Sequence, residues 1–131
     1  MDTCKNTFFS FCQTVATLRS EKGCPWDKKQ TQETLKKYIS EECRELLDAI
    51  DEKDPAHLCE ETGDLLFLLV LLARINEESN HFNIEDVIAG INKKMIRRHP
   101  HVFAGVEVES EEDLKKLWNS IKSAEKAKKI N

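Results

Sequence analysis

The sequence predicts an all-α protein, a helical bundle built on an antiparallel helix hairpin that dimerises into a larger bundle. Apolar residues recur with helical spacing in five successive segments. Asp54-Pro55 marks a turn between two long segments of this kind. Residues 65–73 form an unbroken apolar run, too short for the ~20 residues of a membrane span. A helix that is apolar all round must be covered all round, which favours packing against other helices.

The first two predicted helices lie on either side of a break at residues 22–27. Apolar side chains have helical spacing over residues 6–21, and the second helix covers residues 31–52. Gly23 is typical of a helix C-terminal stop, and Pro25 prevents the first helix from continuing.

The third predicted helix, residues 56–78, contains the apolar run. Asp54 is a typical N-cap and Pro55 a typical first helical residue. A domain of this size has few layers to cover such a helix, so we expect it also to pack on another subunit. A helix that is simply central to a monomeric bundle is the alternative.

The last two predicted helices complete the bundle. Asn83 caps the fourth helix, which runs to about Arg98 and ends before a proline. A loop over residues 103–109 follows, and Ser110 opens the final helix. Residues 122–131 are polar, and we expect this tail to fray.

Length and composition indicate a single cytoplasmic domain over residues 1–131. A net charge of −4 with 34% charged residues provides no global attraction to a nucleic-acid polymer or to an anionic membrane. The five cysteines include no CxxC pair and no secretory signal precedes them, which favours a reducing compartment. A disulfide framework or a structural zinc site is therefore not expected.

Two acidic motifs interrupt the apolar faces of the second and third helices. Glu42 and Glu45 are three residues apart, as are Glu61 and Asp64, so each pair shares a helical face. Glu42 and Glu61 occupy positions where the apolar pattern calls for a hydrophobic side chain. A carboxylate that points toward a core is costly unless it is neutralised.

The two acidic pairs stand at similar distances from the turn near Asp54. At roughly 1.5 Å per residue they lie within about one helical turn of each other on an antiparallel hairpin. Four converging carboxylates suit Mg²⁺ or Mn²⁺, because no His or Cys falls in register with them. The alternative is a solvated acidic face made of ordinary helix ion pairs.

The candidate substrate-binding residues are basic or aromatic. Lys94 and Arg98 share a helical face, with Arg97 beside them, and could hold a polyphosphate opposite a bound metal. They could also simply complement the helix dipole. Trp26 lies in a loop where it could stack on a nucleobase, while Trp118 fits either the apolar stripe of the last helix or a stacking role.

With these residues in view, the chain resembles the MazG family of nucleoside triphosphate pyrophosphohydrolases over residues 18–118. The resemblance lies in four motifs: Cys24-Pro25-Trp26-Asp27 followed by Gln30-Thr31, Glu-Glu-x-x-Glu at residues 41–45, Glu61-x-x-Asp64 followed by Leu65-Leu66-Phe67, and Arg97-Arg98-His99-Pro100-His101-Val102-Phe103. The family has an apolar residue where Thr62 stands, a departure that leaves the acidic residues intact.

The resemblance implies an all-α fold that assembles as a homodimer or a dimer of dimers. It also implies Mg²⁺-dependent hydrolysis of NTPs or dNTPs to monophosphate and pyrophosphate, as in nucleotide-pool cleansing. The family's metal ligands carry over to Glu42, Glu45, Glu61 and Asp64, and Glu41 to a second ion or the attacking water. Lys94 and Arg98 match its phosphate contacts, and Trp26 is placed to contact the nucleoside.

Two other classes of protein compete with this interpretation. One is a non-catalytic helical module that binds nucleotides or a protein partner and carries a degenerate acidic cluster. The presence of all four acidic positions argues against it. The other is a ferritin-like di-iron protein, which requires Glu-x-x-His pairs that neither acidic motif contains.

Overall fold

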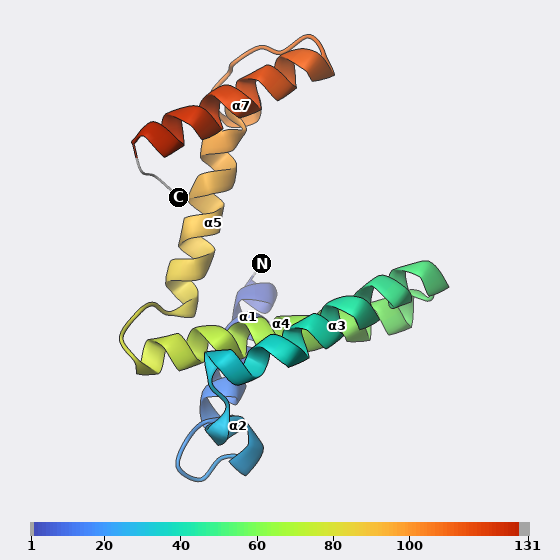
Figure 1. Cartoon of the computed structure of the whole chain (residues 1–131), viewed down its shortest axis with the longest axis vertical. Helices are drawn as coiled ribbons and strands as arrows, with labels where there is room; N and C mark the ends of the chain where they lie inside the picture. Colours follow the sequence, from blue (N-terminus) through green and yellow to red (C-terminus); the bar gives the residue numbers. More distant parts are fainter. Residues whose placement is uncertain (1, 129–131) are drawn as a thin grey trace. The chain divides into compact units, whose positions relative to one another are not determined.

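The computed structural model describes residues 2–128, and all regular secondary structure within them is helical, as the sequence predicts (Figure 1). The described helices are α1 (Asp2–Leu18), α2 (Pro25–Lys29), α3 (Gln32–Glu52), α4 (Pro55–Glu78), α5 (Ile84–Arg98), α6 (Pro100–Phe103) and α7 (Glu111–Ala127). The five long helices match the five predicted segments, and the short α2 and α6 were not predicted. None of the described helices is long and apolar enough to cross a membrane.

The central feature is the antiparallel hairpin of α3 and α4, which lie side by side (Figure 1). Thr31 caps α3, because its side chain accepts a hydrogen bond from the Thr34 backbone N–H. Lys53 closes the turn in the left-handed region with φ 58°. Asp54 then accepts hydrogen bonds from the first backbone N–H groups of α4, so both helix ends are set by local sequence.

The core lies where α1 packs against the hairpin. Val15, Leu35 and Leu71 are fully buried there. Leu66 and Leu69 on α4 remain 42% and 45% exposed, so the described residues of the first unit do not cover this helix completely.

The segment between α1 and α3 differs from the prediction in two ways. Pro25 starts the short helix α2 at its first position, because the missing N–H is one that no helical partner would have satisfied. α1 ends at Leu18, earlier than predicted. Gly23 lies so close to the Leu18 carbonyl that a Cβ atom would clash with it. Arg19 donates to the carbonyls of Asp27 and Gln30 and thereby holds α2 in place.

The chain divides into two compact units, Met1–Ile84 and Glu85–Asn131. In the second unit a buried carboxylate, Glu125, accepts hydrogen bonds from Arg97 at 2.5 Å and from Arg98 at 2.9 Å, and so joins α5 to α7. These two ion pairs hold the C-terminal part of α7 against α5, which explains why α7 continues through Ala127, into the segment expected to fray. The remaining residues of that segment, 129–131, lie outside the described part of the chain.

Candidate functional site

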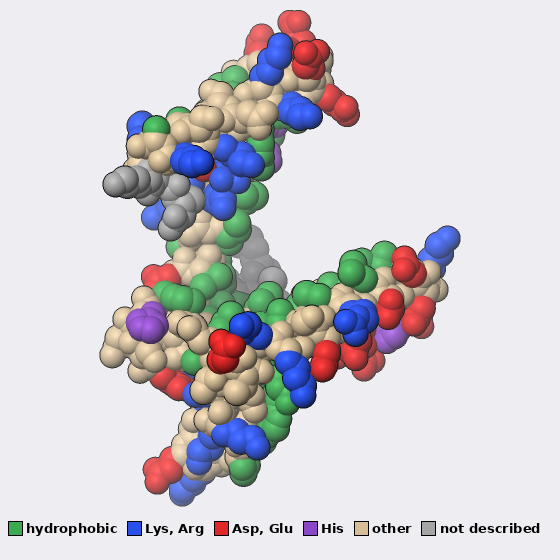
Figure 2. Space-filling model, viewed as in Figure 1, with side chains coloured by type: hydrophobic (Ala, Val, Ile, Leu, Met, Phe, Trp, Pro, Cys, Tyr) green, Lys and Arg blue, Asp and Glu red, His purple; other side chains and the backbone are tan. Residues whose placement is uncertain are grey.

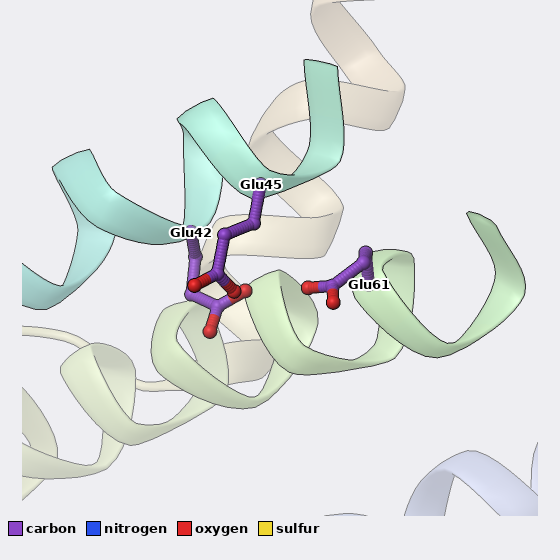
Figure 3. A group of neighbouring side chains, drawn as sticks. All are labelled: Glu42, Glu45 and Glu61. Carbon is purple, nitrogen blue, oxygen red and sulfur yellow. The ribbon is translucent and has the colours of Figure 1, made fainter. Parts of the chain in front are cut away.

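Three of the predicted metal ligands lie together on the hairpin. Glu42 and Glu45 project from α3 and Glu61 from α4, and their side chains point toward one another (Figure 3). One carboxylate oxygen from each lies within 4.8 Å of the others. Two residues from one helical face and one from the neighbouring helix therefore form a compact set of oxygen donors.

The local environment of these carboxylates suits a cation. Glu61 is buried, with 8% of its surface exposed, and its Oε2 atom has no hydrogen-bond partner. Glu42 is half-buried, and its Oε2 atom also has none. Buried polar atoms without a partner are costly, and a divalent cation with a preference for oxygen ligands would satisfy both.

The close approach of the carboxyl groups also affects the pKa of Glu42. Burial and the neighbouring carboxyl group of Glu61, with which Glu42 can share a proton, are the two largest causes that together raise this pKa to about 7. The charges of Glu45 and Asp64 act in the same direction. Without a cation, Glu42 therefore keeps its proton to a higher pH than an ordinary glutamate does.

The remaining predicted acids lie outside this group of three. Asp64 is exposed on α4, near enough for its charge to raise the pKa of Glu42. Glu41 is exposed on α3 and is not part of the cluster.

The expectation that no His falls in register with the acidic residues was wrong, because His57 contacts Glu61 of the cluster. Its Nε2 atom lies 3.1 Å from Oε1 of Glu61, and its Nδ1 atom lies 2.6 Å from Oε2 of Glu52. The hydrogen bond to Glu52 raises the pKa of His57 above its ordinary value. The i,i+4 spacing of His57 and Glu61 is the sequence signal that could have revealed this contact.

Lys94 and Arg98 line a basic pocket in the second unit. The pocket has a volume of about 620 Å³. Its lining residues are Lys94, Arg98, Asn119, Lys122, Ser123, Glu125 and Lys126. Figure 2 shows Lys and Arg side chains gathered where α5 meets α7. Lys122 and Lys126 were not predicted as site residues. Lysines one helical turn apart at a polar helix end are also common on solvent-exposed faces that bind nothing, so their spacing carried no signal.

The other candidate substrate-binding residues make contacts within their own units. Arg97 is paired with Glu125. The Arg98 guanidinium lies 5.3 Å from the centre of the Trp118 ring, and the Trp118 and His99 rings meet edge to face. Trp26 does not lie in a loop as predicted, because Pro25 begins the short helix α2 there. Its ring packs against the core and meets the Tyr38 ring edge to face, with the ring centres 5.2 Å apart.

Comparison with known proteins agrees with these features. A model of the MazG nucleotide pyrophosphohydrolase domain matches residues 30–103. The solved structure of a mazG-related protein from Thermotoga maritima superposes with a TM-score of 0.72 and 29% identity, over 87% of this chain and 97% of that one.

Curated relatives are similar over most of the chain. The uncharacterized protein YabN of Bacillus subtilis is 53% identical over 91% of this chain and 24% of its own length. The nucleoside triphosphate pyrophosphohydrolase/pyrophosphatase MazG of Thermotoga maritima is 52% identical over 86% of the chain and 42% of its own length. The nucleoside triphosphate pyrophosphohydrolase of Escherichia coli K12 is 45% identical over 83% and 41%.

The chain spans less than half the length of these curated relatives. The family model nevertheless covers more than half of the chain and includes the acidic hairpin, α5 and α6. This chain therefore belongs to the family of MazG nucleotide pyrophosphohydrolase domains.

Proposed function

We propose that this chain hydrolyses nucleoside triphosphates between the α and β phosphates, releasing a nucleoside monophosphate and pyrophosphate. Membership of the family and the activity named for the Escherichia coli and Thermotoga maritima relatives support this proposal. The observation that carries it is the cluster of Glu42, Glu45 and Glu61, in which buried oxygens have no hydrogen-bond partner. Such a cluster costs stability without a ligand and therefore indicates a binding role.

The proposed cofactor is Mg²⁺, with Mn²⁺ as a possible substitute. Glu42, Glu45 and Glu61 would hold the ion, and Asp64, whose charge acts on Glu42, is the proposed fourth ligand. When bound, such an ion lowers the pKa of a coordinated water and offsets phosphate charge. Glu41, exposed beside the cluster, remains a candidate for orienting the water or a second ion.

The basic pocket of the second unit is the proposed phosphate-binding region. Lys94, Arg98 and Lys122 line it, and Glu125 fixes the Arg98 guanidinium on one side. A guanidinium held by a buried carboxylate is preorganised to donate its remaining N–H groups to phosphate oxygens. Trp26 and Trp118 remain candidate contacts for the nucleoside.

We also propose that the chain assembles as a homodimer or a dimer of dimers. Leu66 and Leu69 on α4 are exposed, and so are Val87, Ile88 and Ile91 on α5, each by 42–50% of its surface. These residues recur at helical spacing on two helices, so they form apolar faces rather than isolated surface side chains. A second copy of this chain is the proposed partner, because the described residues of the first unit leave these α4 leucines exposed.

Pyrophosphate release from a panel of NTPs and dNTPs tests the catalytic proposal. We expect release with Mg²⁺ and none with EDTA. Glu61→Gln should reduce the rate by at least about 100-fold, whereas Glu60→Gln, an exposed neighbour outside the cluster, should retain it. Nucleotide binding without Mg²⁺-dependent pyrophosphate release would instead support a non-catalytic binding module, and full activity of Glu61→Gln would refute the ligand assignment.

A further inference from the structure

His57 connects a surface carboxylate to a buried one across the hairpin turn. It lies one helical turn before Glu61 on α4, while Glu52 is the last residue of α3. Its two ring nitrogens contact Glu52 at 2.6 Å and Glu61 at 3.1 Å. The side chains become steadily less exposed along this chain of contacts, from 53% for Glu52 to 37% for His57 and 10% for Glu61.

The contact with His57 divides the two oxygens of Glu61 between different roles. Oε1 lies at hydrogen-bond distance from the imidazole, whereas Oε2 is buried and has no partner. A carboxylate held at one oxygen by a ring donor loses rotational freedom, and its other oxygen is presented in a defined direction. The ring is itself held on its far side by Glu52, so its orientation does not depend on Glu61 alone.

We infer that His57, held by Glu52, is a positioning residue that orients the Glu61 carboxylate for metal binding. This inference rests on the proposed function, since it assigns His57 a role only if Glu61 binds a metal ion. The ligand concerned is a divalent cation that prefers oxygen donors, and His57 acts on it through Glu61 without being a ligand itself. Outer hydrogen-bond partners of metal ligands commonly contribute 10–100-fold to metal affinity.

Mg²⁺ titration of the nucleotide-free full chain by isothermal calorimetry tests this inference. The test variants are His57→Leu, which removes both ring contacts, and His57→Gln, which keeps an N–H donor of similar reach. The matched control is Lys53→Gln, which removes a neighbouring positive charge at an exposed residue that is outside the acidic cluster. Melting curves in EDTA establish that each variant is folded.

We expect His57→Leu to weaken Mg²⁺ binding by about 10-fold or more. His57→Gln should recover part of the lost affinity, and Lys53→Gln should bind Mg²⁺ like the wild type. Glu52→Ala should weaken binding less than His57→Leu, because it removes only the outer contact.

The results that overturn the positioning role differ from those that overturn the proposed function. If His57→Leu binds Mg²⁺ as tightly as the wild type, or more tightly, His57 does not orient Glu61 for the metal, while the catalytic proposal stands. An equal loss in Lys53→Gln would show that local charge, and not the imidazole contact, sets the affinity. If the wild type binds no Mg²⁺ and releases no pyrophosphate, the proposed function fails and the role of His57 fails with it.

Discussion

Glu42→Gln should make the metal-free protein less sensitive to pH. Burial, followed by the neighbouring acidic groups, raises the pKa of Glu42 to about 7 in the folded state. In the unfolded chain this carboxyl group regains its ordinary pKa near 4.5. Between these values the folded state holds a proton that the unfolded state releases, so stability that is fully present below the ordinary pKa is lost as the pH rises through about 7.

The size of this effect follows from the difference between the two pKa values. A difference of about 2.5 units corresponds to about 3 kcal/mol once Glu42 is fully ionised. Because Glu42 is only half-buried, solvent screening should reduce this to about 1.5 kcal/mol. For a domain of this size, a loss of about 1.5 kcal/mol lowers the melting temperature by about 6 °C.

The assay is calorimetric melting of wild type, Glu42→Gln and Glu41→Gln at pH 5 and pH 8 in EDTA. The wild type and Glu41→Gln, whose changed residue is exposed outside the cluster, should lose about 6 °C more between these pH values than Glu42→Gln. The raised pKa of His57 also makes the folded state less stable as the pH rises, but this contribution is common to all three proteins. Millimolar Mg²⁺ at pH 8 should then raise the melting temperature of the wild type far more than that of Glu42→Gln.

An equal pH dependence in the wild type and Glu42→Gln would refute this reasoning, because the acidic cluster would then impose no cost on the folded state. Identical wild-type melting curves in EDTA and in Mg²⁺ at pH 8 would count against a preformed cation site.

Two further predictions concern the second unit and the apolar face of α4. Lys94→Ala and Lys122→Ala should each raise the KM for nucleoside triphosphate by about 10-fold, with a smaller change in kcat. The control Lys116→Ala changes a side chain that is 73% exposed and lies outside the pocket, and it should leave the KM unchanged. Unaltered KM values in Lys94→Ala and Lys122→Ala would exclude the basic pocket as the phosphate site. Replacing Leu66 and Leu69 together by Lys should shift the protein toward monomer in sedimentation velocity, because charged side chains resist burial. An unchanged sedimentation coefficient would place any interface elsewhere.

The hairpin and its ends were predictable because the signals are local. Thr31 and Asp54 cap helices through hydrogen bonds to residues two or three positions away, so their sequence neighbours reveal the geometry. Leu35 and Ala49, which share a helical face with Glu42 by their spacing in the sequence, are fully buried. The short helices α2 and α6 were missed because each begins with a proline, which is as typical of a break as of a helix start.

Helical periodicity and capping chemistry therefore determine the all-α class, the α3–α4 hairpin and the face on which Glu42, Glu45 and Glu61 lie. Only the tertiary structure showed that these three carboxylates approach within 4.8 Å, that Asp64 stays exposed, and that His57 contacts Glu61. It also brought Lys122 beside Lys94 and Arg98. Local rules set the direction of a side chain from its own helix, whereas distances between helices depend on how their packed surfaces fit together.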